Sequence, residues 1–203
     1  MTEARRDEHA VVAWGWAGRA LETESGDLHV VAVFPGGALV ALMDGLGHGP
    51  EAAVAANAAA LVLETHPGDP VTVLVERCHA ALRKTRGTVM SLASFCVAQA
   101  SMTWLGIGNV DGVVVRSDGR RTEGIANRGG VVGYKVPSLR ANTLDISPGD
   151  TLIMATDGIS SGFTANLSVD EDPQLLADLL LARFAKGSDD AHVVVARYLG
   201  GRS

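Results

Sequence analysis

The chain is poor in cysteine, in aromatic side chains and in clustered basic residues, and each shortage argues against a class of protein. Its 203 residues include two cysteines, Cys78 and Cys96, in apolar stretches, which favours reduced core thiols in a cytoplasmic protein over a disulfide. Aromatic residues make up 4%, the formal net charge is −6 and no basic stripe is present. A nucleic-acid partner is therefore not expected, because such proteins use clustered cations and stacking aromatics.

Long hydrophobic runs are missing as well. The charged residues 1–9 are followed by no apolar stretch of about 20 residues, the length that a membrane-spanning helix requires. Hydrophobic residues nevertheless make up 47% of the chain, enough for a folded core, and no repeat or linker divides it. We expect a single domain over residues 1–203 that is monomeric and is neither secreted nor attached to a membrane.

The pattern of apolar and turn residues predicts strands in runs, with helices inserted between them. Strands are predicted at 30–34, 39–43, 89–100, 103–107, 113–117, 121–126, 152–155 and 191–198. Helical spacing predicts helices at 50–64, 70–83 and 171–184. Residues 35–37 predict a glycine-rich hairpin turn, and Asp111-Gly112 and Asp118-Gly119 predict turns within one antiparallel meander. This order favours an α+β sandwich of antiparallel sheets covered by helices over a doubly wound parallel sheet.

Carboxylates stand at the ends of several predicted strands. Asp44, Asp157 and the pair Asp189-Asp190 adjoin apolar runs, and neither Asp44 nor Asp157 has a Lys or Arg beside it in sequence. A carboxylate at the end of a buried strand is costly to desolvate unless it is paired or bound to a cation. A hard cation with oxygen ligands, such as Mg²⁺ or Mn²⁺, would remove this cost.

Asp-Gly is also the commonest hairpin turn, so one such pair by itself favours a turn over a metal site. Asp44 differs because it opens residues 44–50, Asp-Gly-Leu-Gly-His-Gly-Pro, directly before a predicted helix. Three glycines there allow the backbone to approach a ligand closely. Asp44 is therefore the central candidate for a metal ligand.

Four acidic motifs, in this order, resemble the motif set of the PPM (PP2C-like) metal-dependent phosphatases. They are Ser25-Gly26-Asp27, Asp44-Gly45-Leu46-Gly47-His48-Gly49, Ala155-Thr156-Asp157-Gly158-Ile159 and Asp189-Asp190-Ala191-His192. Residues 106–110 and 128–133 also resemble central segments of the family, so the similarity covers nearly the whole chain. The most similar branch is the small bacterial one that contains SpoIIE, RsbU and RsbX. Within it the short chain resembles RsbX, because RsbU and SpoIIE carry regulatory domains ahead of the catalytic one.

The resemblance implies a sandwich of two antiparallel sheets flanked by helices, with two Mn²⁺ or Mg²⁺ ions in a cleft at one edge. By this comparison Asp44 bridges both ions, the Gly45 carbonyl binds one, and Asp157 and Asp189 hold the other. Asp27 binds directly or through water, and this assignment rests on the resemblance alone. Two ions about 4 Å apart can share and activate a water, so Asp44 is also the expected catalytic residue.

The chain departs from the larger family in two places. Many members carry a histidine two residues after the bridging aspartate, with a proposed general-acid role, whereas this chain has Leu46 there and His48 two places later. We therefore do not assign His48 as the proton donor. The arginine that grips the substrate phosphate in some members has no clear counterpart, and Arg19 is no more than a weak candidate. His192 is expected to be structural.

These expectations describe a phosphoserine or phosphothreonine protein phosphatase. On the resemblance, its substrate is a phosphorylated STAS-domain signalling protein in a bacterial stress-response module of the stressosome type. Two alternatives stay open. One is a catalytically inactive module of the same fold that binds phosphoproteins, and the other is a different two-metal phosphoester hydrolase, which the acidic balance and low aromatic content disfavour when the substrate is nucleic acid.

Overall fold

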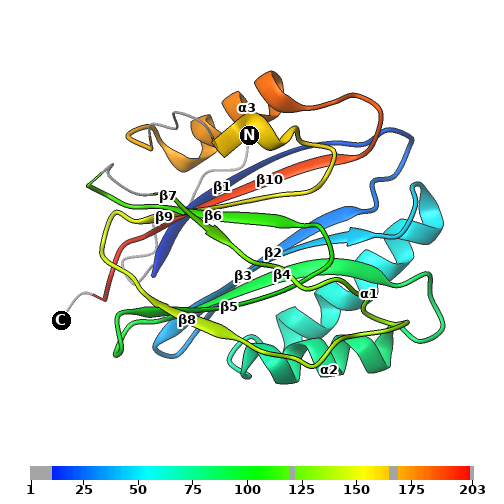
Figure 1. Cartoon of the computed structure of the whole chain (residues 1–203), viewed down its shortest axis with the longest axis horizontal. Coiled ribbons are helices and arrows are strands. Elements are labelled where there is room, and N and C mark those ends of the chain that lie inside the picture. The colour runs from blue at the N-terminus through cyan, green and yellow to red at the C-terminus, as the bar shows by residue number, and fades with distance from the viewer. Residues whose placement is uncertain (1–10, 119–121, 165–168, 202–203) are drawn as a thin grey trace.

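Two five-stranded antiparallel sheets lie face to face, and helices cover their outer faces (Figure 1). The computed structural model describes residues 11–118, 122–164 and 169–201. The first sheet has the order β1 (Val12–Arg19), β10 (Ala191–Tyr198), β9 (Thr151–Ala155), β6 (Asp111–Val115) and β7 (Thr122–Ile125). The second has the order β2 (Asp27–Phe34), β3 (Gly37–Gly45), β4 (Thr88–Cys96), β5 (Ser101–Ile107) and β8 (Asn142–Asp145). The predicted sandwich of two antiparallel sheets is confirmed.

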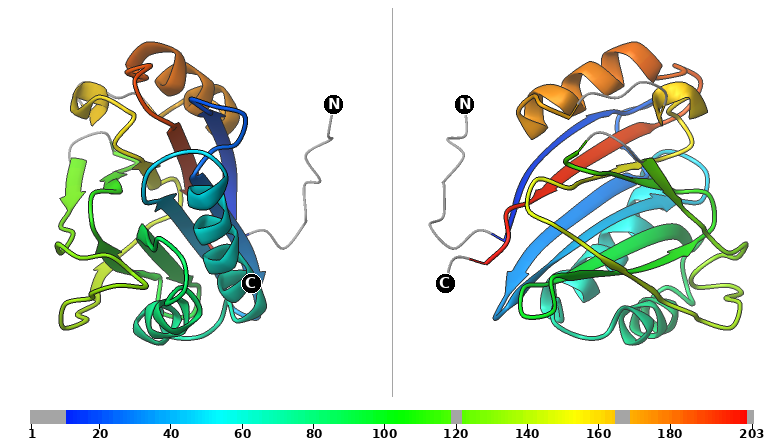
Figure 2. Two further views of the ribbon diagram at one scale, coloured as in Figure 1. Left: turned by 90° about the vertical axis from the view of Figure 1, so that its right-hand side faces the viewer. Right: turned by 60° about the vertical axis from the view of Figure 1, so that its left-hand side comes forward.

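The helices lie on opposite sides of this sandwich (Figure 2). The α3 helix (Pro173–Phe184) and the short 3-10 helix η1 (Ser161–Thr164) pack on the first sheet. The α1 helix (Pro50–Thr65) and the α2 helix (Val71–Ala81) pack on the second. No helix in the described ranges is long and apolar enough to cross a membrane.

Strand β3 shows how one run of sequence serves two layers of the core. Side chains alternate across a strand, so Val40 and Leu42 pack between the sheets while Leu39 and Met43 pack under α1 and α2. Because both faces are buried, residues 38–43 form a continuous apolar run instead of an alternating one.

Small residues bring α1 close to the end of β3. The helix begins at Pro50, in the first helical turn, and buries an alanine face that includes Ala52, Ala55 and Ala59. A β-carbon at Gly45 would lie 2.2 Å from the Ala52 carbonyl oxygen, so no larger residue fits at that position. The segment after Asp44 is therefore fixed against the helix.

The predicted meander from 89 to 126 is wrong. β5 and β6 belong to different sheets, and the chain crosses between them at 108–110, where Gly108 has a φ of 97°. Asp111 and Gly112 begin β6 instead of forming a turn, and a β-carbon at Gly112 would lie 2.3 Å from the Trp104 ring. The second predicted turn, Asp118-Gly119, lies partly outside the described residues.

Several bounds and elements differ from the sequence prediction. β4 ends at Cys96 because residues 97–100 turn, and α2 ends at Ala81. β8 was not predicted, since its sequence Asn-Thr-Leu-Asp is mostly exposed and has no apolar run. The short helix η1 was not predicted either.

Candidate active site

The predicted carboxylates gather where both sheets end on one side of the molecule, at the right in Figure 1. Asp27 begins β2 and Asp44 lies near the end of β3, and the two are opposite each other in the β2–β3 pairing. Asp157 follows β9 and Asp189 precedes β10. Asp44, Asp157 and Asp189 line one pocket of about 340 Å³, together with Leu46, Gly47, His48, Val89, Asn109 and Val131.

Asp27 is the most buried member of this group. Its side chain is 5% exposed, and its Oδ2 accepts a hydrogen bond from Thr156 Oγ1 at 2.8 Å. Burial, together with the charges of Asp190, Asp157 and Asp189, raises the pKa of Asp27 to about 7 against the opposing effect of the Thr156 hydrogen bond. The hydrogen bond also joins the two sheets at this edge.

Asp44 is only partly buried, yet its pKa is raised more. Burial, together with repulsion from Asp27, Asp157, Asp189 and Asp190, raises the pKa of Asp44 to about 8. Within the described residues no ion pair involves Asp27, Asp44, Asp157 or Asp189. The site therefore concentrates negative charge without a basic partner.

Asp157 is held by residues from two loops. Its Oδ2 accepts a hydrogen bond from Asn109 Nδ2 at 2.8 Å, and its backbone carbonyl accepts one from Lys186 Nζ at 2.5 Å. A β-carbon at Gly158 would lie 1.9 Å from the Asp190 carbonyl oxygen, so the glycine after Asp157 is required by packing. The sequence alone does not identify Asn109 as a site residue, although it lies in the family-like segment 106–110.

The adjacent Asp189 and Asp190 do different things. Asp190 is 4% exposed, and its two carboxylate oxygens accept hydrogen bonds from the Leu21 and Gly26 amides, both at 2.7 Å. Asp189 is exposed, lines the pocket and accepts a hydrogen bond from the Asp190 amide at 2.9 Å. Asp190 thus fixes the loop before Asp27, while Asp189 is the one of the pair that faces the pocket.

Gly45 lies between the pocket and α1. Its amide donates to the Gly26 carbonyl at 3.0 Å, and its side of the strand packs against Ala52. This contact alone explains why residue 45 is glycine, and it leaves the proposed use of the Gly45 carbonyl as a separate question.

The donor set suits a hard cation, although its side chains do not yet converge. Among the described residues no three Asp, Glu, His or Cys side chains form a ready group for one ion. The hydrogen bond to Asn109 holds one oxygen of Asp157, and the carboxylates repel each other. Carboxylates without basic partners nevertheless fit Mg²⁺ or Mn²⁺, which take oxygen ligands and supply the missing positive charge.

The other candidate residues lie at the margin of the site. His48 lines the pocket and pairs with Glu22 at 2.7 Å, with both side chains about half exposed. Arg19 is exposed at the end of β1 and is not among the pocket-lining residues.

His192 lies in a cluster of rings away from the pocket. It stacks on Trp16 with 5.1 Å between ring centroids, and its Nε2 lies 2.9 Å from His29 Nδ1. Burial lowers the pKa of His192 to about 3, helped by His29, and lowers that of His29 to about 4. Both rings are neutral near pH 7, in keeping with a structural contact between β10 and β2.

The sandwich and its carboxylate edge define the PP2C-like class of fold. The family model described as Stage II sporulation protein E (SpoIIE) matches residues 35–199. The match spans most of the chain, which therefore belongs to the SpoIIE family of PP2C-like proteins.

Known relatives agree with this assignment. The phosphoserine phosphatase RsbX of Bacillus subtilis (strain 168) is 26% identical over 122 residues, which are 60% of this chain and 61% of that protein. A structure of RsbX in complex with magnesium has a TM-score of 0.84 at 20% identity, covering 98% of this chain and all of the other. A structure from work on the bacterial stressosome has a TM-score of 0.83 at 29% identity, covering 92% of this chain and 99% of the other.

Proposed function

We propose that the protein is a metal-dependent phosphatase that hydrolyses phosphoserine or phosphothreonine in a signalling protein. One observation carries the proposal: Asp44 near the end of one sheet and Asp157 and Asp189 beside the strands of the other line a single pocket, and none of them has a Lys or Arg ion-pair partner among the described residues. Membership of the SpoIIE family and the similarity to a phosphoserine phosphatase support it.

We propose two Mg²⁺ or Mn²⁺ ions as the cofactor. Asp44 would contact both, the Gly45 carbonyl one, Asp157 and Asp189 the other, and Asp27 directly or through water. The magnesium in the RsbX structure supports this choice. When bound, such ions supply positive charge and an activated water for phosphoester hydrolysis.

The residues of the chain itself set the geometry of this site. Asn109 orients Asp157 through the 2.8 Å hydrogen bond, and Asp190 fixes the loop that leads to Asp27. Gly45 packed on Ala52 keeps Asp44 at a constant distance from α1. These contacts fix the loops and the strand end that carry the carboxylates, which limits the rearrangement that binding of a cation requires.

The identity of the substrate protein and the cellular compartment are part of the same proposal. We propose a phosphorylated STAS-domain protein of a stressosome-like module as the substrate, supported by the relatives RsbX and the stressosome structure. We also propose a monomer in the cytoplasm; the two free cysteines, Cys78 and Cys96, fit the reducing conditions of that compartment.

The proposal is tested by phosphate release from a purified phosphorylated STAS-domain protein. We expect release with Mn²⁺ or Mg²⁺, none with EDTA, and none from Asp44→Asn. Asp69→Asn, which changes a partly exposed carboxylate in the Asp69–Arg77 ion pair, is the matched control and keeps its activity. Full activity in EDTA contradicts the metal-dependent mechanism. Binding of the phosphoprotein without phosphate release identifies the inactive module instead.

A further inference from the structure

Basic residues are distributed very unevenly along this acidic chain. Residues 77–110 and 124–144 contain no Asp or Glu but hold seven of the 17 Lys and Arg residues: Arg77, Arg83, Lys84, Arg86, Arg128, Lys135 and Arg140. All 23 acidic residues lie in the rest of the chain, with the other ten basic ones. Two segments of a protein with net charge −6 are therefore wholly positive.

These two segments pack against each other beside the carboxylate pocket. The Thr88 and Val132 backbones exchange two hydrogen bonds, at 3.0 and 2.8 Å, and the Gly133 amide donates to His79 Nδ1 at 3.0 Å. Gly87 and Gly133 have φ angles of 82° and 100°, which favour glycine. Val131, in the same loop, lines the carboxylate pocket.

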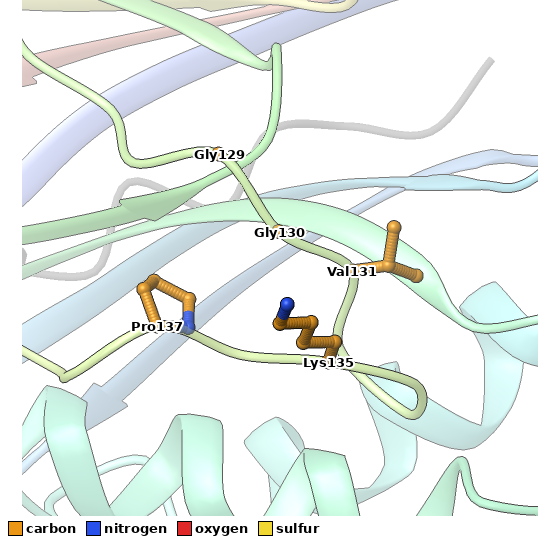
Figure 3. A pocket seen from close by; sticks show the side chains of 5 residues that line it. All are labelled: Gly129, Gly130, Val131, Lys135 and Pro137. Carbon is orange, nitrogen blue, oxygen red and sulfur yellow. The ribbon is translucent and has the colours of Figure 1, made fainter.

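A second pocket opens on the other side of Val131. It measures about 390 Å³ and is lined by Gly129, Gly130, Val131, Lys135 and Pro137. Figure 3 shows the Lys135 side chain reaching back between Gly130 and Pro137, with its ammonium group inside the pocket. Val131 is thus a wall shared by a pocket that presents carboxylates and one that presents a lysine.

Five exposed cations of these two segments form what we call the basic rim: Arg83, Lys84, Arg86, Arg128 and Lys135. The Arg86 guanidinium lies over Gly47 of the carboxylate pocket and pairs with Glu51. The other four form no ion pair within the described residues. Their charge is available to a partner.

We propose that the basic rim and the Lys135 pocket form the docking surface for acidic residues that flank the phosphorylated Ser or Thr of the substrate protein. The inference rests on the proposed phosphatase function and adds the chemistry of the substrate sequence. A phosphoprotein is repelled by the acidic remainder of this chain, and a positive rim next to the site attracts it. An extended segment crossing Val131 places its phosphate at the carboxylate pocket and an acidic side chain against Lys135.

The test compares phosphoserine peptides whose flanks carry Asp and Glu on the N-terminal side, on the C-terminal side, or not at all. Lys135→Glu is compared with wild type and with Arg183→Glu, which makes the same charge change at an exposed position of α3 on the opposite outer face. The wild type prefers an acidic peptide. Lys135→Glu lowers kcat/KM for that peptide by about tenfold, mainly by raising KM. Its kcat/KM values for an aryl phosphate and for the neutral peptide stay close to those of wild type.

Arg183→Glu has the wild-type kcat/KM on every substrate. Added salt weakens the preference for the acidic peptide, because the basic rim is exposed. The proposal is overturned if Lys135→Glu loses as much kcat/KM on the aryl phosphate as on the acidic peptide. It is also overturned if both Lys135→Glu and Lys135→Gln still prefer the acidic peptide.

Peptide binding, measured by fluorescence anisotropy, separates this inference from the proposed function. Wild-type binding that Lys135→Glu alone weakens, without any phosphate release, supports the docking surface and contradicts the phosphatase. Phosphate release without an acidic preference in rate or binding contradicts the docking surface and leaves the phosphatase standing.

Discussion

The molecule has buried or partly buried carboxylates at two sites, one at Asp150 and one at Asp27 and Asp44, and their pKa values shift in opposite directions. Asp150 is 2% exposed, and it accepts hydrogen bonds from the Arg116 guanidinium at 2.9 Å and from the Ser117 and Ser147 amides at 2.8 and 3.0 Å. Burial raises its pKa, but these contacts outweigh burial and the pKa is lowered. At the other place burial and neighbouring carboxylates raise the pKa of Asp27 and Asp44. Asp150, paired with a cation, favours the ionised form, whereas Asp27 and Asp44 lack a cation and favour the protonated form until a ligand supplies positive charge.

The largest expected effect comes from removing a carboxylate at the site of Asp27 and Asp44. Asp44→Asn should lower turnover on an aryl phosphate in Mn²⁺ by more than about 100-fold, because it removes the carboxylate proposed to contact both ions. The same variant should melt at a higher temperature than wild type in EDTA, since one of several repelling charges is gone. Normal turnover, or a melting temperature well below wild type in EDTA, makes Asp44 a structural turn residue.

A substitution at the Asp150 site should instead lower stability and leave activity unchanged. Arg116→Met leaves Asp150 buried without its cation and should destabilise the protein by about 2 kcal/mol, less than a fully buried pair, since the Arg116 side chain is 21% exposed. Urea unfolding measures this change. The kcat of the folded variant should equal that of wild type, and a loss of kcat would mean that the two places are coupled.

The pair Asp189 and Asp190 sharpens the comparison within two residues. Asp189→Asn should lose about ten times more activity than Asp190→Asn, because only Asp189 faces the pocket. Asp190→Asn should instead expose the Gly26 amide, which donates to Asp190 Oδ2 in the wild type, to faster hydrogen exchange. The reverse ranking of activities would assign the ligand to Asp190.

The comparison can also be tested by the slope of stability against pH in EDTA. The folded pKa values of about 7 for Asp27 and about 8 for Asp44 lie above the usual 3.8, so the folded state holds protons that the unfolded state has lost. Stability should therefore fall as pH rises from about 4 to about 8. Asp150, whose folded pKa is lowered, contributes fully above pH 3.8, and its contribution is lost only as pH falls through that lower pKa.

Melting curves at several pH values test this slope. Asp44→Asn should flatten it, and Asp69→Asn should leave it as in wild type. A melting temperature that rises steadily with pH up to 8 would contradict the raised pKa values.

The sequence was informative where one run of residues carries the whole signal. The apolar residues of β3 followed by Asp44-Gly45 predicted both a buried strand and a carboxylate at its end, and the order of the acidic motifs indicated the family. The same dipeptide misled at Asp111-Gly112, because Gly112 is required by the Trp104 ring of the other sheet. Only the fold reveals that contact.

Other parts of the site depend on partners far away in sequence. Asn109 acts on Asp157, 48 residues away, and Asp190 acts on Gly26, 164 residues away. Neither the residue types nor their spacing in the sequence predicts such contacts. The basic rim is visible as charge in the sequence, but only the Thr88–Val132 pairing shows that its two halves are neighbours.

The pairing of β1 with β10 has a consequence for synthesis of the chain. Val12 lies opposite Tyr198, and among the strands that the structure describes β1 lies at the edge of its sheet and pairs with β10 alone. A ribosome releases β1 long before the segment that pairs with it, so the first sheet closes only after residues 191–198 have emerged. The second sheet, with β2, β3, β4 and β5 paired in chain order, can assemble earlier. The strands that carry Asp27 and Asp44 can thus pair before Asp189 has been synthesised.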